Sequence, residues 1–139
     1  MKKLANLSII YFILAMAGGV FYREFTKFND FTGQTALSVV HTHLMVLGTI
    51  VFLIVLLMAK NFPLLEEKLF KPFMIIYNIA LTLMAVTLLV RGVFQVRGTL
   101  LSTAVDASIS GIAGITHVAL FVSLLMLLLA IKNSVSKNN

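Results

Sequence analysis

Four apolar runs constrain this chain more than any other feature of its sequence. Each is close to or longer than the roughly 20 residues that an α-helix needs to cross a bilayer. The polar joints between them are short, which favours antiparallel packing of consecutive helices. We therefore expect an all-α integral membrane protein, a compact four-helix bundle that forms one domain over residues 1–139. The expected spans are approximately Leu4–Tyr22, Ala36–Ala59, Pro72–Val96 and Ala107–Ile131.

The composition supports this class and excludes others. Hydrophobic residues make up 60% of the chain and charged residues 12%, and the mean hydropathy is +1.03. A net charge of +6 is compatible with nucleic-acid binding, but no basic stripe interleaved with aromatic residues accompanies it, so we expect no nucleic-acid partner. The absence of cysteine excludes disulfides, thiolate ligands, iron–sulfur clusters and covalently attached c-type haem.

The N-terminus has some features of a signal peptide. Met1–Lys3 is followed by an apolar run, and Ala15–Ala17 resembles a cleavage site. Because the apolar run continues to Tyr22, beyond the usual length of such a signal, we expect this segment to remain as the first span.

The distribution of basic residues predicts the orientation. Both termini and the second joint together carry seven basic residues, whereas the first and third joints with their flanks carry four. By the positive-inside rule we expect both termini in the cytoplasm of a bacterial cell, with the chain in its cytoplasmic membrane. The seven are Lys2, Lys3, Lys60, Lys68, Lys71, Lys132 and Lys137; the four are Arg23, Lys27, Arg91 and Arg97.

Three histidines within the apolar spans are the candidate functional residues. His41 and His43 lie in the second span and His117 in the fourth. Ionisable side chains at membrane depth are costly and usually face a cavity, a partner or a cofactor. In this topology His41 and His43 lie ~8–11 Å, and His117 ~15 Å, along their helices from the outer side. We therefore expect all three in one outer layer.

His41 and His43 are predicted to point in nearly opposite directions. Residues i and i+2 are about 200° apart around an α-helix. One span can therefore present ligands to two separate sites, and it is poorly suited to hold one small ion with both imidazoles. On the fourth span, Ser110, Gly114, His117 and Phe121 share a face, whose small residues allow close approach of either another helix or a flat macrocycle.

The arginines of the outer side complete the predicted site. Arg23 follows the first span, and Arg91 and Arg97 lie near the outer end of the third. Imidazole ligands with guanidinium groups above them suit a b-type haem, since histidine binds the iron and arginine binds the propionates. Snorkelling of each arginine to the interface is the competing interpretation. Asp106 is interpreted as a helix N-cap, and Gln95 as a hydrogen-bond partner of a propionate or a neighbouring helix.

Parts of the chain resemble known families. The stretches Tyr22–Phe25, His41–Gly48 and Asp106–Gly111 resemble a family of small four-span bacterial membrane proteins without assigned function. The stretch His41–Gly48 is also similar to the histidine-bearing spans of the catalytic subunit of haem–copper oxidases and nitric oxide reductases. It further resembles a multi-span haem- and copper-binding family involved in the response to nitric oxide.

The second resemblance implies an assembly. The haem–copper subunit consists of three four-helix arcs around a pseudo-threefold axis, and a His-x-His pair on one helix serves two haems. By analogy, identical copies of this chain would form a homotrimer, with His41 and His43 reaching haems at the subunit interfaces. The chain has neither the tyrosine-linked copper-site pattern nor an adjacent His-His pair, so the resemblance does not imply oxygen reduction at a haem–copper centre.

The sequence thus predicts a membrane haem b protein, with His41, His43 and/or His117 as ligands and Arg23, Arg91 and Arg97 at the propionates. The haem lies either within one chain or between chains. Its activity would be electron transfer with two histidine ligands, or binding of a diatomic gas such as NO or O2 with one open position. The alternatives are a copper or zinc site made of three imidazoles, a histidine proton relay, and a cofactor-free accessory subunit.

Overall fold

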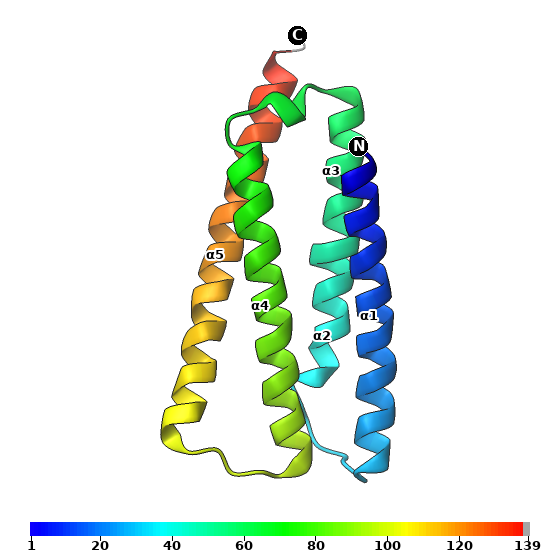
Figure 1. Cartoon of the computed structure of the whole chain (residues 1–139), viewed down its shortest axis with the longest axis vertical. Coiled ribbons are helices and arrows are strands. Elements are labelled where there is room, and N and C mark those ends of the chain that lie inside the picture. Colours follow the sequence, from blue (N-terminus) through cyan, green and yellow to red (C-terminus); the bar gives the residue numbers. More distant parts are fainter. Residues whose placement is uncertain (138–139) are drawn as a thin grey trace.

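The computed structural model describes residues 1–137, which form helices and connecting loops (Figure 1). Four helices are long and apolar enough to cross a membrane, which confirms the predicted all-α four-span class. The second crossing comprises three consecutive helical segments. The elements are α1 (Lys2–Phe28), α2 (Leu37–His43), the π-helix η1 (Leu44–Ile50), α3 (Val51–Asn61), the 3-10 turn η2 (Leu64–Glu66), α4 (Phe70–Arg97) and α5 (Thr103–Ser136).

The helix ends extend beyond the apolar runs. α1 continues to Phe28, so the first part of the first predicted joint is helical. α4 ends where Gly98 adopts the left-handed conformation, φ 63°, which glycine tolerates without strain. α5 begins after Ser102, whose side chain accepts a hydrogen bond from the backbone nitrogen of Val105. Asp106, the predicted N-cap, is therefore inside the helix, and that prediction was wrong.

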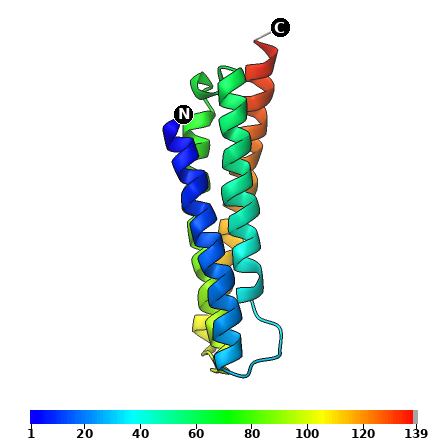
Figure 2. The same cartoon turned by 90° about the vertical axis from the view of Figure 1, so that its right-hand side faces the viewer.

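Both described ends of the chain lie at the same end of the molecule (Figures 1 and 2). We call this the lysine end, because it carries Lys2, Lys3, Lys60, Lys68, Lys71, Lys132 and Lys137. The opposite end, with the loop between α1 and α2, is the arginine end and carries Arg23, Arg91 and Arg97.

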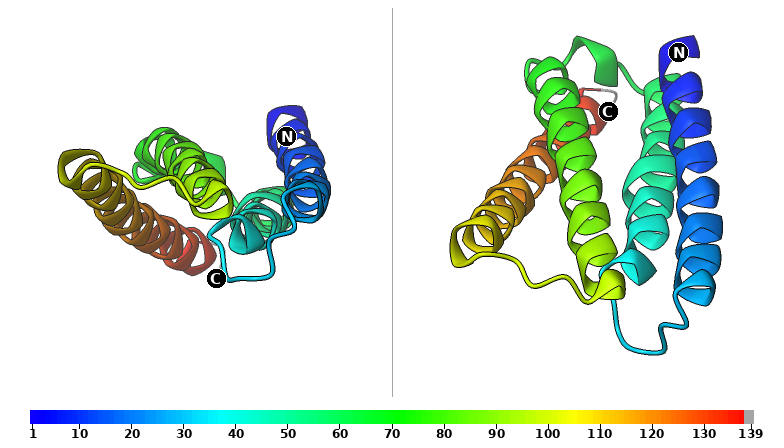
Figure 3. Two further views of the ribbon diagram at one scale, coloured as in Figure 1. Left: turned by 90° about the horizontal axis from the view of Figure 1, so that it is seen from below. Right: turned by 60° about the horizontal axis from the view of Figure 1, so that its bottom comes forward.

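The helices form a row in chain order, which is best seen from below (Figure 3). α1 packs against the second crossing, the second crossing packs against α4, and α4 packs against α5. Aromatic rings fill the centre. Tyr11 and Phe52 stack with 5.6 Å between ring centroids, and Phe52 meets Tyr77 edge-on at 5.8 Å.

α5 is packed closely from Thr116 to the lysine end, but not at the arginine end. Ala130 and Ser134 are fully buried there, and the Lys137 Nζ atom lies 2.6 Å from Glu67 Oε1 on the η2 side. Residues 103–115, at the arginine end, include no buried side chain. Figure 3 shows α5 leaning away from the other helices at that end. The bundle is therefore more open on this side than the short joints predict.

The π-helix η1 directly follows the two histidines of the second crossing. Two of its carbonyl groups accept hydrogen bonds from other helices: Leu47 from the Tyr77 hydroxyl at 2.7 Å, and Thr49 from the Ser8 hydroxyl at 3.0 Å. Between them, Gly48 packs against Tyr11 so closely that a Cβ atom would lie 2.5 Å from the tyrosine Cβ. α1 and α4 therefore both contact the π-helix through specific polar groups.

Candidate haem site between the second crossing and α5

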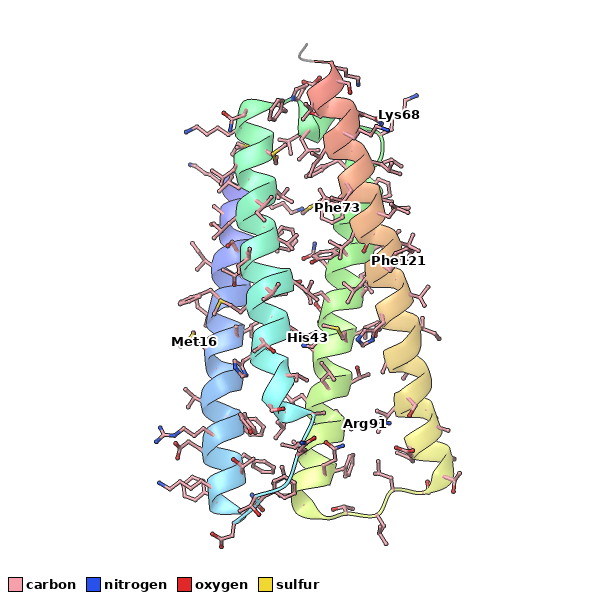
Figure 4. All side chains as sticks on the ribbon, turned by 180° about the vertical axis from the view of Figure 1, so that it is seen from behind. Met16, His43, Lys68, Phe73, Arg91 and Phe121 are labelled. Carbon is pink, nitrogen blue, oxygen red and sulfur yellow. The ribbon has the colours of Figure 1, made fainter. Side chains whose placement is uncertain are left out.

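His43 is the last residue of α2 and points into the space between the second crossing and α5 (Figure 4). Thr42, His43, Val46 and Leu47, all on the second crossing, line an open hollow of about 300 Å³ beside His43. The Nδ1 atom of His43 is 2.7 Å from the carbonyl oxygen of Val39. Because a carbonyl oxygen only accepts, Nδ1 carries the proton and the lone pair of the neutral ring is on Nε2.

His117 has the same arrangement on α5. Its Nδ1 atom is 2.7 Å from the carbonyl oxygen of Ala113, and its side chain is exposed. The hydrogen bond again places the proton on Nδ1 and leaves Nε2 as the free donor atom. An Nδ1–H bond to a backbone carbonyl is the usual support of a histidine that binds a metal through Nε2, since it fixes the tautomer and the ring orientation.

His43 and His117 lie at the same depth. Leu37 of α2 lies level with Gly92 of α4, because a Cβ atom at Gly92 would lie 2.5 Å from the Leu37 nitrogen. Ser110 of α5 lies level with the next residue of α4, because its hydroxyl is 2.6 Å from Arg91 Nη2. His43 is six residues after Leu37, and His117 is seven residues after Ser110. Both histidines therefore lie ~9–11 Å from these reference points toward the lysine end.

The face of α5 that carries His117 is open. Ser110, Gly114 and His117 lie along one stripe of α5, because they are three, four and seven residues apart. Arg91 of α4 donates a hydrogen bond to the Ser110 hydroxyl, so this stripe borders α4. No atom of residues 1–137 lies within 4 Å of a Cβ atom built at Gly111 or Gly114, apart from the helix's own nearby backbone. We call the space between His43 and this stripe the arginine-end groove.

His41 points away from the arginine-end groove. Its ring lies over α1, where a Cβ atom at Gly19 would be 3.6 Å from the His41 Cγ atom. The opposite orientations predicted for His41 and His43 are thus observed. The Nδ1 atom of His41 is buried and has no hydrogen-bond partner among the described residues. The structure therefore places His43 and His117 at one depth on two different helices, and it places His41 on the α1 side of the second crossing.

The three candidate arginines are also separated. Arg91 lies beside the arginine-end groove, where its Nη2 atom contacts Asp106 Oδ1 at 3.1 Å as well as Ser110 (Figure 4). Arg97 is the exposed last residue of α4. Arg23 is on α1, at the other end of the row from α5, and lies 3.7 Å from Glu24. Of the three, Arg91 is the one that contacts the stripe of α5 that carries His117.

Two further observations bear on the predicted alternatives. The Gln95 side chain accepts a hydrogen bond from the backbone nitrogen of Ala36 at 2.7 Å, so it binds a neighbouring helix start. Residues 1–137 contain no cluster of three or more His, Cys, Asp or Glu side chains positioned to hold a metal ion. A copper or zinc site of three imidazoles is therefore not assembled within the described part of one chain.

Comparison with known proteins identifies a family whose function is unknown. A family model described as "Protein of unknown function (DUF2871)" matches residues 1–134. No curated protein and no solved structure matches the chain.

Proposed function

Because the chain belongs to this family of proteins of unknown function, we propose its function from the geometry of the arginine-end groove: it binds one b-type haem between His43 and His117. The single observation that carries the proposal is the matched geometry of these two residues. At one depth, on the second crossing and on α5, both rings donate Nδ1–H to the carbonyl four residues earlier and leave Nε2 free.

The surroundings fit this cofactor. Gly114 leaves room for a flat ring beside His117 on α5, and apolar Val46 and Leu47 lie beside His43 on the second crossing. Arg91 lies toward the arginine end, where a guanidinium pairs well with a propionate carboxylate. The charged propionates would then lie at the membrane surface and the apolar ring within the apolar layer, so each part of the haem would be in surroundings of its own polarity.

Two histidine ligands favour electron transfer over gas binding. A haem with both axial positions filled supplies reversible one-electron chemistry, whereas gas binding needs an open position. We therefore propose that the chain is an electron-transfer protein of the bacterial cytoplasmic membrane, with its lysine end inside. His41 is not a ligand of this haem, because it lies over α1. A homotrimer with further haem between subunits stays a prediction from the resemblance.

The test is the visible spectrum of the detergent-purified chain after addition of haem, oxidised and then reduced with dithionite. We expect a Soret band and the sharp reduced bands of a six-coordinate haem. His43→Ala and His117→Ala should each remove the six-coordinate spectrum, and His41→Ala, the matched control, should retain it.

Other outcomes would contradict parts of the proposal. Loss of the spectrum in His41→Ala but not in His117→Ala would place the haem on the other side of the second crossing. Carbon monoxide binding by the reduced wild type would indicate an open position and favour gas binding. A colourless chain with bound copper or zinc by elemental analysis would support the metal site, and a chain with neither would support the relay or accessory role.

A further inference from the structure

A second hollow lies at the lysine end, between the starts of α1 and α4, and is independent of the proposed haem. Its volume is about 370 Å³, within the range of small-molecule sites. We call it the lysine-end groove. It is lined by Met1, Lys3, Leu4, Leu65, Phe70, Lys71 and Met74.

The charged side chains that line this groove are both positive, and exposed Glu66 beside Leu65 is not part of the lining. Lys3 is on α1 and Lys71 on α4, and both are exposed. Neither helix has an acidic residue in its first turn or a side-chain N-cap among the described residues, so the positive ends of both helix dipoles add to the lysines. The nearby acid Glu67 does not line the groove and is paired with Lys137.

The floor of the groove is apolar. Leu4 and Phe70 are buried beneath it, and Leu65 and Met74 complete the lining. These residues lie where α1 and α4 leave the apolar part of the bundle, the level at which the headgroups of a bilayer meet its acyl chains. A free anion gains nothing from such a floor, whereas an amphiphile gains from both the lysines and the apolar residues.

We propose that the lysine-end groove binds an anionic phospholipid. Lys3 and Lys71 contact the phosphate from two sides, and the first acyl carbons lie over Leu4, Phe70 and Met74. Basic pockets between transmembrane helices are suited to such headgroups, since the charges lie at the interface and the tails remain in the bilayer.

Native mass spectrometry tests this proposal. The full chain is purified in mild detergent and equilibrated with equal amounts of phosphatidylglycerol and phosphatidylcholine. We expect retention of phosphatidylglycerol. The double variant Lys3→Gln/Lys71→Gln should reduce the retained fraction at least fivefold. The control Lys60→Gln/Lys132→Gln, with the same change of charge at exposed positions of the same end, should change it less than twofold.

Further variants and lipids distinguish binding in the lysine-end groove from attraction of lipid by the net charge of the protein. Lys3→Arg/Lys71→Arg keeps the charge and should keep the lipid, which distinguishes lost recognition from misfolding. Equal loss in the control variant would show that retention follows net charge and would overturn the proposal. Equal retention of phosphatidylcholine, or displacement of the lipid by excess inorganic phosphate, would overturn it as well.

Discussion

Arg91 on α4 and Asp106 on α5 form an ion pair across the arginine end of the groove, with 3.1 Å between Nη2 and Oδ1. Their side chains are 32% and 61% exposed, so the pair stabilises the fold by at most ~1 kcal/mol. Its structural effect is to fix the position of the first part of α5, because residues 103–115 bury no side chain of their own. The same arginine is therefore placed both to hold α5 and to meet a carboxylate that enters the groove.

The dual position of Arg91 predicts a specific effect on haem affinity. Arg91→Gln should raise the haem dissociation constant about tenfold, equivalent to ~1.4 kcal/mol, because the propionate loses its guanidinium partner. Asp106→Asn should not weaken binding, since the amide oxygen can still accept a hydrogen bond from Arg91 and hold α5, while the competing negative charge is removed. Haem titration followed by absorbance gives both constants. Arg23→Gln is the control, and an equal loss of affinity in that variant would contradict a specific role of Arg91.

The open face of α5 predicts that the groove can be blocked without loss of the fold. Gly114→Phe should abolish haem binding, because the new ring would occupy the space beside His117, while the helix content stays unchanged, since nothing lies within 4 Å of the Gly114 Cβ position. Ile115→Phe is the matched control, because Ile115 is 72% exposed on the outside of the same turn. Haem absorbance and circular dichroism are the two measurements. Normal haem binding by Gly114→Phe would exclude this groove.

Much of this arrangement follows from local sequence rules. Four apolar runs predict the spans, and a separation of two residues predicts that His41 and His43 diverge. The π-helix was not predicted, because the hydroxyl groups that bind its carbonyls come from Ser8 and Tyr77 on other helices. The pairing of Arg91 with Asp106 was also missed, since it depends on how far α5 leans from α4 and not on either residue's own helix.

The π-helix should depend on the hydroxyl of Tyr77. Tyr77→Phe leaves the part-buried Leu47 carbonyl without this donor and should lower the free energy of unfolding by ~1 kcal/mol. Unfolding by sodium dodecyl sulfate in detergent micelles measures the change. Ser123→Ala is the control, because the Ser123 hydroxyl binds the Leu120 carbonyl of its own helix, which stays bonded within that helix. Equal losses in the two variants would show that the bond between helices adds nothing specific.

The same substitution at two helical glycines should have opposite effects on stability. Gly48→Ala places a Cβ atom 2.5 Å from Tyr11 Cβ and Cγ, so α1 must move away from the π-helix at a cost of ~1–3 kcal/mol. Gly111→Ala meets no atom within 4 Å and should stabilise α5 by up to ~1 kcal/mol through helix propensity alone. Micellar unfolding gives both values. Because alanine is the better helix former at both positions, a loss of stability at Gly48 reports the packing of Tyr11 against the π-helix. An increase in stability in Gly48→Ala would mean that α1 does not pack closely against the π-helix.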